Sequence, residues 1–444
     1  MKKTYVLDTN ILVHSPDCLF GFEDNDLVIT TMTVSELDKL KSMPGETGYG
    51  AREAIRQLRE LNDRGELYRN GAALKTGGRV KIVMDEEKSC IADIFKLNEP
   101  DNRILNTVKS MQVRQENVYL VTNDNGMLLK AGACGIKAQD YHNESLDQNT
   151  KAYTGIKVVD CMLFDIKNVS FGNPLDIWDK TGLYENSFVI LNALDANMKY
   201  PAKIKNGKIH RLEYVKDGEA VFGAMPRGIK QCFALEALLA PASEIPLVFL
   251  TGPAGTSKTF LSLAAGMEGV LKTARYDYMI LTRNNVSFDE DIGFLPGREE
   301  EKISPLLRCF TDNLEDLIKL ESPKISRADM SERFRTYFET GQICMEAMNF
   351  MRGRSLHDVY IIVDEAQNAS VRQIKGMVTR PGIRTKTVLC GDPEQIDNAK
   401  LSRRSNGLVY AAEKMKDSAL SAQVSFSAED CIRSPLAKEA AKKL

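Results

Sequence analysis

The sequence lacks the features that mark secreted, zinc-binding and membrane-spanning proteins. Its nine cysteines are scattered without a C-x-x-C pair and its four histidines are isolated, so we expect neither a disulfide framework nor a zinc site. No apolar run approaches the roughly 20 residues of a membrane span. Asp8 and Asn10 interrupt the apolar start too early for a signal peptide. These absences predict a cytoplasmic protein that does not engage a membrane.

The chain also lacks an excess of charge of either sign. Its net charge is −2, with 43% apolar and 27% charged residues, which is ordinary for a globular protein. A nucleic acid would therefore have to bind to a local basic patch rather than to a general positive field. At 444 residues, the chain is long enough for two or three domains.

The strongest motif that is present is GPAGTSKT, which follows the apolar run 245–250. Small residues let a backbone wrap around phosphates, and the N-terminus of the helix that follows attracts negative charge. Lys258 would reach the outer phosphates, and the Thr259 hydroxyl would join a Mg²⁺ shell. The competing interpretation, a strand–turn–helix with accidental glycines, does not explain the Lys-Thr pair in register. The predicted nucleotide-binding residues of this loop are Gly252, Pro253, Ala254, Gly255, Thr256, Ser257, Lys258 and Thr259.

One residue of the loop departs from the usual pattern. Ser257 stands where the pattern has glycine. Serine is small enough for the loop, but a positive φ at this position would be disfavoured.

Other residues of the C-terminal half supply partners for this loop. Gln231 lies in a helix upstream, where a side-chain amide can pair with both the donor and the acceptor on the edge of adenine. The apolar stretch 359–363 predicts a strand that ends at Asp364, a Mg²⁺ ligand, and Glu365, a general base for water. Gln395 would sense the γ-phosphate, and Arg433 is a candidate arginine finger.

The N-terminal segment alternates short apolar runs with helical periodicity, which predicts a mostly parallel sheet. Carboxylates stand after its strands and near the starts of its helices, where functional groups of such sheets collect. They would bind Mg²⁺ or Mn²⁺ if they converge, and they are ordinary capping or solvated acids if they do not. Spacing alone leaves both interpretations open for Asp8, Glu36, Asp101 and Asp124.

Two further regions carry weaker signals. The Gly-rich stretch 66–81 and its surroundings hold basic residues that either grip a phosphate backbone or form a solvated loop: Arg64, Arg69, Lys75, Arg79 and Lys81. The middle of the chain has short alternating runs, and the pairs Asn206-Gly207 and Asp217-Gly218 predict hairpins in a small β-rich, barrel-like segment. Trp178 and Tyr184 there would stack on a base or, by default, pack against their own segment.

Short sequence motifs of the N-terminal segment resemble those of a known family. The stretches DTNILVH, SELDKLK, AREAIR, DNRIL and VTND, in this order, resemble the PIN nuclease family. The resemblance implies that Asp8, Glu36, Asp101 and Asp124 form the metal-binding quartet of an RNA-cleaving endonuclease, with Asn10, Thr122 and Asn102 beside it. In relatives, the residue before Asp124 is often Lys, whereas here it is Asn123, which removes one positive charge near the substrate. Several PIN-like domains bind RNA without cutting it.

The C-terminal half resembles the PhoH-like ATPase family through LTRNNVSFDEDIGFLPGREEEKISP, MRGRSL, VDEAQN, VTRPGIRTK, GDPEQID and RSPLA. The resemblance implies a RecA-like core of the superfamily-one helicase type. With a PIN domain, it implies ATP-dependent RNA unwinding coupled to cleavage. The arginines that it suggests for phosphate or RNA contact are Arg283, Arg352, Arg354 and Arg380. The departures at Ser257, Asn284 and SPLLRCF concern the rate of ATP hydrolysis and the contacts of an oligomer.

We therefore expect an α/β protein with a PIN-type parallel-sheet domain at 1–148, a β-rich segment at 149–225 and a RecA-like P-loop ATPase domain at 226–444. Its cofactors would be ATP and Mg²⁺, with Mg²⁺ or Mn²⁺ at the PIN site. Its function would be an RNA helicase coupled to a metal-dependent endoribonuclease. The alternatives are an RNA-binding nucleotide switch with an inactive PIN domain, and a motor directed to DNA. Because a single RecA-like core needs a neighbour to complete its ATP site, we expect a homo-oligomeric ring, for which a hexamer is one arrangement.

Overall fold

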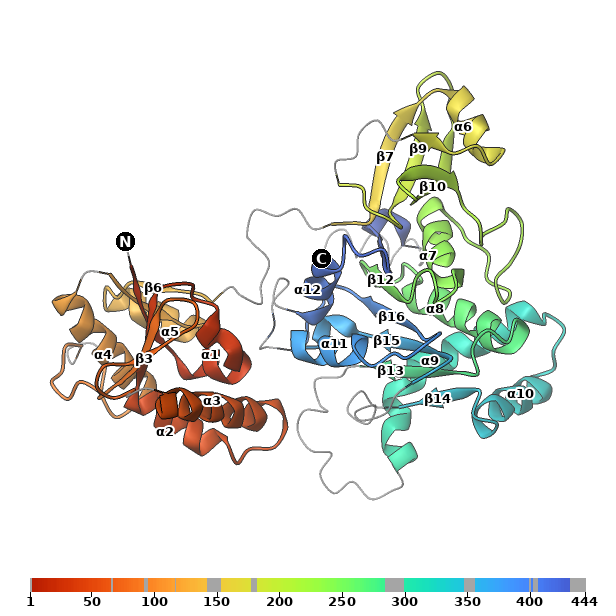
Figure 1. Cartoon of the computed structure of the whole chain (residues 1–444). Coiled ribbons are helices and arrows are strands. Elements are labelled where there is room, and N and C mark those ends of the chain that lie inside the picture. Colours follow the sequence, from red (N-terminus) through yellow and green to blue (C-terminus); the bar gives the residue numbers. More distant parts are fainter. Residues whose placement is uncertain are drawn as a thin grey trace. The chain divides into compact units, whose positions relative to one another are not determined.

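The structure is a computed structural model in which the chain forms two compact units (Figure 1). The first contains Met1–Asp147 and the second contains Gln148–Val286 and Leu295–Leu444. No described helix is long and apolar enough to cross a membrane. The structure describes residues 2–64, 67–91, 95–115, 117–141, 153–176, 182–283, 299–346, 356–398, 401 and 406–431. Several residues singled out above lie outside these ranges: Trp178, Asn284, Arg352, Arg354 and Arg433.

The first unit contains the predicted parallel sheet, in the order β3-β4-β2-β1-β5-β6. All neighbouring strands pair in parallel except β3, which is antiparallel to β4 at one edge. The strands are β1 (Thr4–Leu7), β2 (Asp26–Thr30), β3 (Ala72–Ala73), β4 (Arg79–Val83), β5 (Val118–Val121) and β6 (Ala138–Gln139). The helices are α1 (Thr9–His14), α2 (Thr31–Leu40), α3 (Gly45–Arg64), α4 (Pro100–Arg114) and α5 (Asn125–Ala133).

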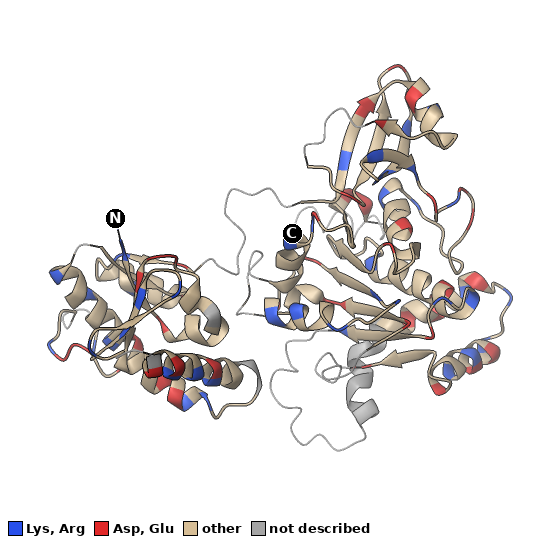
Figure 2. Cartoon of the chain, viewed as in Figure 1, with Lys and Arg blue, Asp and Glu red and all other residues tan. Residues whose placement is uncertain are grey.

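The basic stretch 66–81 is not a free loop. It includes β3 and the start of β4, and the Leu74 N–H donates to the Gly78 carbonyl at 2.8 Å to close the turn between them. Along the neighbouring α3, acidic and basic residues are mixed (Figure 2), and Arg56 pairs with both Glu53 and Glu60. The described part of this helix therefore carries no basic stripe of its own.

The middle of the chain forms a five-stranded sheet in the order β7-β9-β10-β11-β8. Its strands β7 and β8 are edges among the described residues, so the sheet is open rather than a closed barrel. The Asn206-Gly207 hairpin is confirmed: φ is 53° and 69° at these residues, and Lys205 pairs with Lys208. The elements are β7 (Ile156–Cys161), α6 (Leu163–Ser170), β8 (Leu175–Asp176), β9 (Phe188–Ala193), β10 (Lys199–Lys205) and β11 (Lys208–Arg211).

The hairpin predicted at Asp217-Gly218 is wrong. A turn occurs there, but residues 212–246, which are all described, contain no strand beyond a single Val221–Ala224 bridge. The reason is that the backbone N–H groups of Glu213, Tyr214 and Val215 donate to the buried carboxylate of Glu236 instead of to a neighbouring strand.

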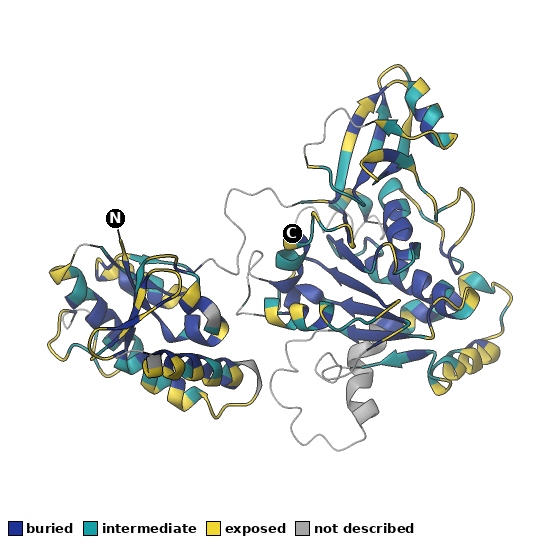
Figure 3. Cartoon of the chain, viewed as in Figure 1, coloured by how far each residue is buried: buried dark blue, intermediate teal, exposed yellow. Residues whose placement is uncertain are grey.

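The C-terminal half contains an all-parallel sheet in the order β14-β13-β15-β16-β12-β17. Its central strands are buried along their whole length (Figure 3), as expected for a sheet with helices on both faces. The strands are β12 (Leu247–Thr251), β13 (Tyr278–Arg283), β14 (Ile343–Met345), β15 (Val359–Asp364), β16 (Lys386–Gly391) and β17 (Ser421–Ser425). The helices are α7 (Ile229–Leu239), α8 (Lys258–Met267), α9 (Glu299–Glu321), α10 (Arg327–Glu339), α11 (Val371–Val378) and α12 (Gly407–Lys414).

Candidate functional site

The phosphate-loop motif forms the turn between β12 and α8, at the carboxyl edge of the parallel sheet. Gly252 has a φ of +134°, and a Cβ there would lie 2.6 Å from the carbonyl oxygen of Phe426. Gly255 has a φ of +83°. Both positions therefore require glycine, which explains why the loop is built from small residues.

Ser257, the departure from the pattern, is the residue immediately before α8. Its backbone is left-handed, with φ 67° and ψ 21°, and its side chain makes no capping hydrogen bond. The structure thus places an L-residue where the loop needs a positive φ, at a cost of about 1 kcal/mol.

Ser257→Gly is therefore expected to stabilise the second unit by about 1 kcal/mol, because it relieves the backbone and breaks no side-chain bond. The matched control is Ser331→Gly in the exposed helix α10, which should destabilise by about 0.5–1 kcal/mol. Denaturant unfolding of the two variants measures both changes in the free energy of unfolding. If Ser257→Gly is less stable than the wild type, the backbone of Ser257 is not strained.

Lys258 and Thr259 begin α8 and point toward the carboxyl ends of the strands. The Lys258 Nζ donates to the carbonyls of Gly252 at 2.6 Å and Pro253 at 2.9 Å, and burial lowers its pKa. The Thr259 hydroxyl donates to Asp364 Oδ1 at 2.8 Å. Burial, and then the neighbouring Glu365 charge, raise the pKa of Asp364. An ion with two positive charges between Thr259 and Asp364 would remove this penalty.

Glu365 follows Asp364 with a left-handed backbone and is held by both of its oxygens. Arg283 Nη2 donates to Oε1 at 3.1 Å and Gln367 Nε2 donates to Oε2 at 2.6 Å. The same Gln367 amide donates to the Gln395 carbonyl at 2.8 Å and accepts the Asp392 N–H at 3.1 Å. One buried glutamine thus connects the ends of β15 and β16 and fixes the orientation of Glu365.

These groups surround a cavity of ≈ 720 Å³. The sequence predicted ten of its lining residues: Gln231, Ala254, Gly255, Ser257, Lys258, Thr259, Arg283, Asp364, Glu365 and Gln395. Gly252, Pro253 and Thr256 of the loop do not line the cavity, and neither does Arg380. The Thr256 hydroxyl donates instead to the Pro253 carbonyl within the loop. The sequence missed lining residues before α7 and on α9, which carry no motif: Met225, Arg227, Asn313 and Leu320.

In the first unit, Asp8 is the most buried of the four predicted acids, with 5% of its surface exposed. It follows β1 and caps α1. The Thr9 N–H donates to its Oδ1 at 2.6 Å, and the Thr122 hydroxyl donates to its Oδ2 at 2.6 Å. The pKa of Asp8 is raised to about 7, mainly by burial and also by the charges of Asp101 and Glu36. Its two hydrogen bonds act in the opposite direction. Three of the four acids therefore influence one another.

Asp101, in the first turn of α4, and Asp124, after β5, occupy the expected positions, whereas Glu36 does not. Glu36 lies in the middle of α2 rather than near its start, because Thr30 caps the helix, and it accepts the Thr9 hydroxyl. Asp124 caps α5, where its Oδ1 accepts the N–H groups of Gly126 and Met127 at 2.6 and 3.1 Å. Among the described residues, no group of three or more His, Cys, Asp or Glu side chains is spaced to hold a metal ion. The oxygen donors suit a hard divalent cation in kind but are not preassembled around one.

A lysine approaches this site from α5. Lys130 Nζ lies 3.6 Å from Asp101 Oδ2 and 3.4 Å from Glu99 Oε2. Asn123, the residue expected to leave the site with one charge fewer, instead accepts the Tyr141 N–H at 2.9 Å. The positive charge next to the acids is therefore supplied from α5 rather than from position 123.

Asp8 predicts a pH dependence for the first unit. Its pKa lies near 7 in the folded chain and near 3.8 in the unfolded chain, so the folded state holds a proton that the unfolded state has lost. Stability should therefore fall by about 2 kcal/mol between pH 5 and pH 8 when a chelator removes divalent cations.

Asp8→Asn, which cannot ionise, should lack this part of the pH dependence and be the more stable protein at pH 8. Thermal unfolding of both proteins with a chelator, at pH 5 and pH 8, measures it. The same slope in both proteins would show that Asp8 ionises without penalty.

Comparison with known proteins gives matches to both halves of the chain. Residues 224–444 match the model of the PhoH-like protein family, and residues 5–142 match a PIN domain model. The chain is 34% identical over 435 residues to "Protein PhoH2" of Bacillus subtilis, which covers 96% of each chain. It is 29% identical over 438 residues to "Protein PhoH2" of Mycolicibacterium smegmatis, covering 98% of this chain and 95% of that one. A shorter "PhoH-like protein" of Bacillus subtilis is 35% identical over 237 residues, which are 52% of this chain and 70% of that one.

Proposed function

Because the chain belongs to the PhoH-like protein family and carries a PIN domain, we propose that it is an RNA-processing enzyme that couples ATP hydrolysis to RNA movement and cleavage. In this proposal, residues 226–444 hydrolyse ATP and move or unwind RNA. Residues 1–148 cut the RNA with a divalent cation, and the β-rich segment 149–225 connects the two.

The observation that carries the ATPase part is the cavity in which Lys258, the Thr259–Asp364 pair and Glu365 meet at one sheet edge. Mg²⁺ bound beside Thr259 and Asp364 would neutralise phosphate charge. Lys258, now bonded to loop carbonyls, would turn to the outer phosphates. Glu365, oriented by Arg283 and Gln367, would polarise the attacking water, and Gln395 would sense the γ-phosphate.

In the nuclease part, Asp8, Glu36, Asp101 and Asp124 would hold Mg²⁺ or Mn²⁺, which would stabilise charge on the phosphodiester. Thr122 and Thr9 fix the Asp8 carboxylate by hydrogen bonds to its two oxygens. A second function is favoured by one observation, the absence of a preassembled cluster of three acids in the described chain. In that case the PIN domain only binds RNA, and the ATPase acts as a nucleotide switch.

Incubation of the full chain with labelled RNA and Mn²⁺, without ATP, tests the nuclease. We expect cleavage by the wild type and a loss of at least about a hundredfold in Asp8→Asn, whose folding the pH experiment above checks. No cleavage of varied RNAs by the wild type would favour the switch. A matched DNA strand as competitor distinguishes RNA from DNA, because equal competition would indicate a motor that accepts either polymer.

We also propose that the chain works as a homo-oligomeric ring, since one RecA-like sheet forms only one wall of such a nucleotide site. Arg433, which lies outside the described residues, would reach a neighbour's nucleotide as an arginine finger. Light scattering with ATP and Mg²⁺ measures the mass. A monomer with full ATPase activity would refute the ring.

A further inference from the structure

The outer face of α6 carries two phenylalanine side chains that are mostly exposed. Phe164 is 71% exposed, and Phe171, directly after the helix, is 79% exposed. The inner face of α6 buries Ile166 and Val169 against the middle sheet, so the core of this segment does not use the two phenylalanines. Because they are about two turns apart, both rings lie on one face of the helix, with the exposed Lys167 between them.

Two more exposed apolar side chains, Met162 and Leu194, extend this surface at the start of α6. The Leu194 N–H donates to the Cys161 carbonyl at 2.9 Å, and the Leu163 N–H donates to Asp195 Oδ1 at 2.8 Å. These bonds hold the two stretches side by side. Exposed apolar side chains that gather in one place mark an interaction surface. We call the following four residues the α6 surface: Met162, Phe164, Phe171 and Leu194.

The charges around the α6 surface disfavour a nucleic acid as its partner. Three carboxylates lie close to its Met162 end: Asp160, Asp165 and Asp195. After desolvation, their charges are the causes that raise the pKa of the neighbouring Cys161 thiol. Carboxylates repel a phosphate backbone, whose binding depends on positive side chains. The surface therefore suits a protein partner with exposed apolar side chains of its own.

A groove with matching chemistry lies between α9 and α10 of the same unit and has a volume of ≈ 360 Å³. Its apolar lining comes from Met330, Phe334 and Phe338, and the centroids of the two phenylalanine rings are 4.9 Å apart. Both rings are only half-buried. The groove therefore offers aromatic surface against which another aromatic ring can pack.

The α6 surface and the groove lie beyond opposite edges of the parallel sheet. Among the described strands, β17 is one edge, and its Ser425 N–H donates to the Thr154 carbonyl, just before β7, at 3.1 Å. The other edge is β14, which α10 contacts. Six strands spaced about 4.8 Å apart place these edges about 24 Å from each other, and α6 and α10 lie at opposite ends of the second unit (Figure 1). The surface of one copy therefore cannot reach its own groove, whereas two copies can join head to tail.

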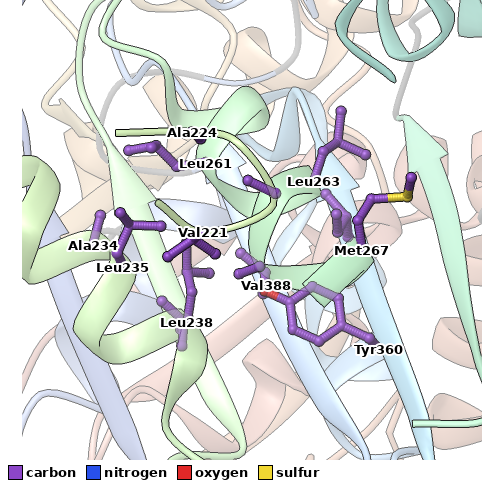
Figure 4. Packing of buried hydrophobic residues seen from close by; sticks show 14 of the residues in the cluster. Val221, Ala224, Ala234, Leu235, Leu238, Leu261, Leu263, Met267, Tyr360 and Val388 are labelled. Atoms are coloured by element: carbon purple, nitrogen blue, oxygen red, sulfur yellow. The ribbon is translucent and has the colours of Figure 1, made fainter. Parts of the chain in front are cut away.

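One apolar core holds the α6 surface and the groove in fixed positions. It extends from Phe188 of β9, whose ring stacks on Phe233 of α7 at 4.8 Å, to Met330 of the groove. Figure 4 shows part of this core, in which Val388 of β16 lies beside Tyr360 of β15. Both surfaces are therefore preformed, which lowers the entropy cost of association.

We propose that the α6 surface of one copy of this chain docks into the α9–α10 groove of the next copy. Phe164 and Phe171 pack against the aromatic lining of the groove. Lys167, between them, faces the carboxylates of Glu315 and Glu339, which also line it. The proposal rests on the proposed homo-oligomeric ring and names the two surfaces that join its members.

Two variants of the full chain test the contact, because each removes one side of it. Phe164→Asp with Phe171→Asp changes only exposed side chains, and Ser331→Trp fills the groove from an exposed position of α10. In light scattering with ATP and Mg²⁺, the wild type should be an assembly and each variant alone a monomer. An equal mixture of the two variants should give dimers, since one intact surface then meets one intact groove and no further copy can add. Val113→Asp, which changes an apolar side chain of α4 that is 77% exposed, should keep the wild-type mass.

Lys167→Glu tests the charge pairing without touching the apolar side chains. It places a third carboxylate against Glu315 and Glu339, so the dissociation constant of the assembly should rise by about tenfold or more. An unchanged dissociation constant would overturn the pairing of Lys167 with the groove.

The wild-type mass in either docking variant, or a mixture that stays monomeric, would overturn the contact. Loss of RNA binding with an unchanged mass in the phenylalanine variant would assign the α6 surface to RNA instead. ATP hydrolysis and RNA cleavage, measured on the same wild-type samples, test the proposed function separately. A monomeric wild type that hydrolyses ATP would therefore refute the ring and this contact, but not the ATPase.

Discussion

Lys258→Ala is expected to lose nearly all nucleotide hydrolysis, by about a thousandfold in kcat/KM, because it removes the one lysine of the phosphate loop. A positive side chain next to the transferred phosphate stabilises the negative charge of the transition state. Its loss raises the activation free energy by several kcal/mol. The variant should also fail to unwind RNA. Cleavage of unstructured RNA, assigned to the other unit, should be retained.

Folding of this variant should be intact, since the Lys258 ammonium is buried on two carbonyls at an energetic cost that its pKa shift records. Lys319→Ala is the matched control, because it removes an exposed lysine of α9 that pairs with Asp316 on the helix surface. Radiometric hydrolysis and a strand-displacement assay give the two activities. Normal unwinding by Lys258→Ala would show that the motor site lies elsewhere.

Much of this fold could be predicted from the sequence because its elements have local signals. The buried strands are apolar runs followed by the residues of the site, as at 247–251 before the phosphate loop and at 359–364 before Glu365. Parallel pairing then brings Lys258 and Asp364 to one edge without any further information. The family resemblance predicted which two domains the chain contains and in which order, and the comparisons confirm both domains.

What the sequence could not give are contacts that depend on packing. Met225 and Leu320 lie far apart in the chain and carry no motif, yet both line the cavity. The Arg227 N–H that holds Gln231 is a backbone group, invisible in residue letters. Glu36 was misplaced along its helix because Thr30, rather than a later residue, provides the cap.

The same limit applies to the Asp217-Gly218 turn, where a buried carboxylate replaces the expected strand pairing. Glu236, on the middle of α7 and 1% exposed, accepts the N–H groups of Glu213, Tyr214 and Val215 at 2.8 to 3.0 Å. It also accepts Lys203 Nζ, from β10, at 2.8 Å. One side chain therefore joins the middle sheet to the helix that carries Gln231.

Glu236→Ala is consequently expected to destabilise the second unit by about 3–5 kcal/mol. It removes the nearer carboxylate from the buried Lys203 ammonium, which keeps Glu213 at 3.3 Å, and leaves three backbone donors without their acceptor. Glu219→Ala, which breaks an exposed pair with Lys216 in the same connection, should cost under about 1 kcal/mol. Denaturant unfolding measures both.

Removing both charges separates the two causes of this loss. In Glu236→Leu with Lys203→Leu, no unpaired charge remains, so stability should recover in part. The recovery should stay incomplete, because the N–H groups of residues 213–215 still lack an acceptor. Full recovery would mean that these N–H groups find water, and that the carboxylate serves only Lys203. Since α7 also presents Gln231, which lines the nucleotide cavity, the double variant should raise KM for ATP more than it lowers kcat. Measuring KM and kcat of ATP hydrolysis tests whether the middle sheet positions this residue.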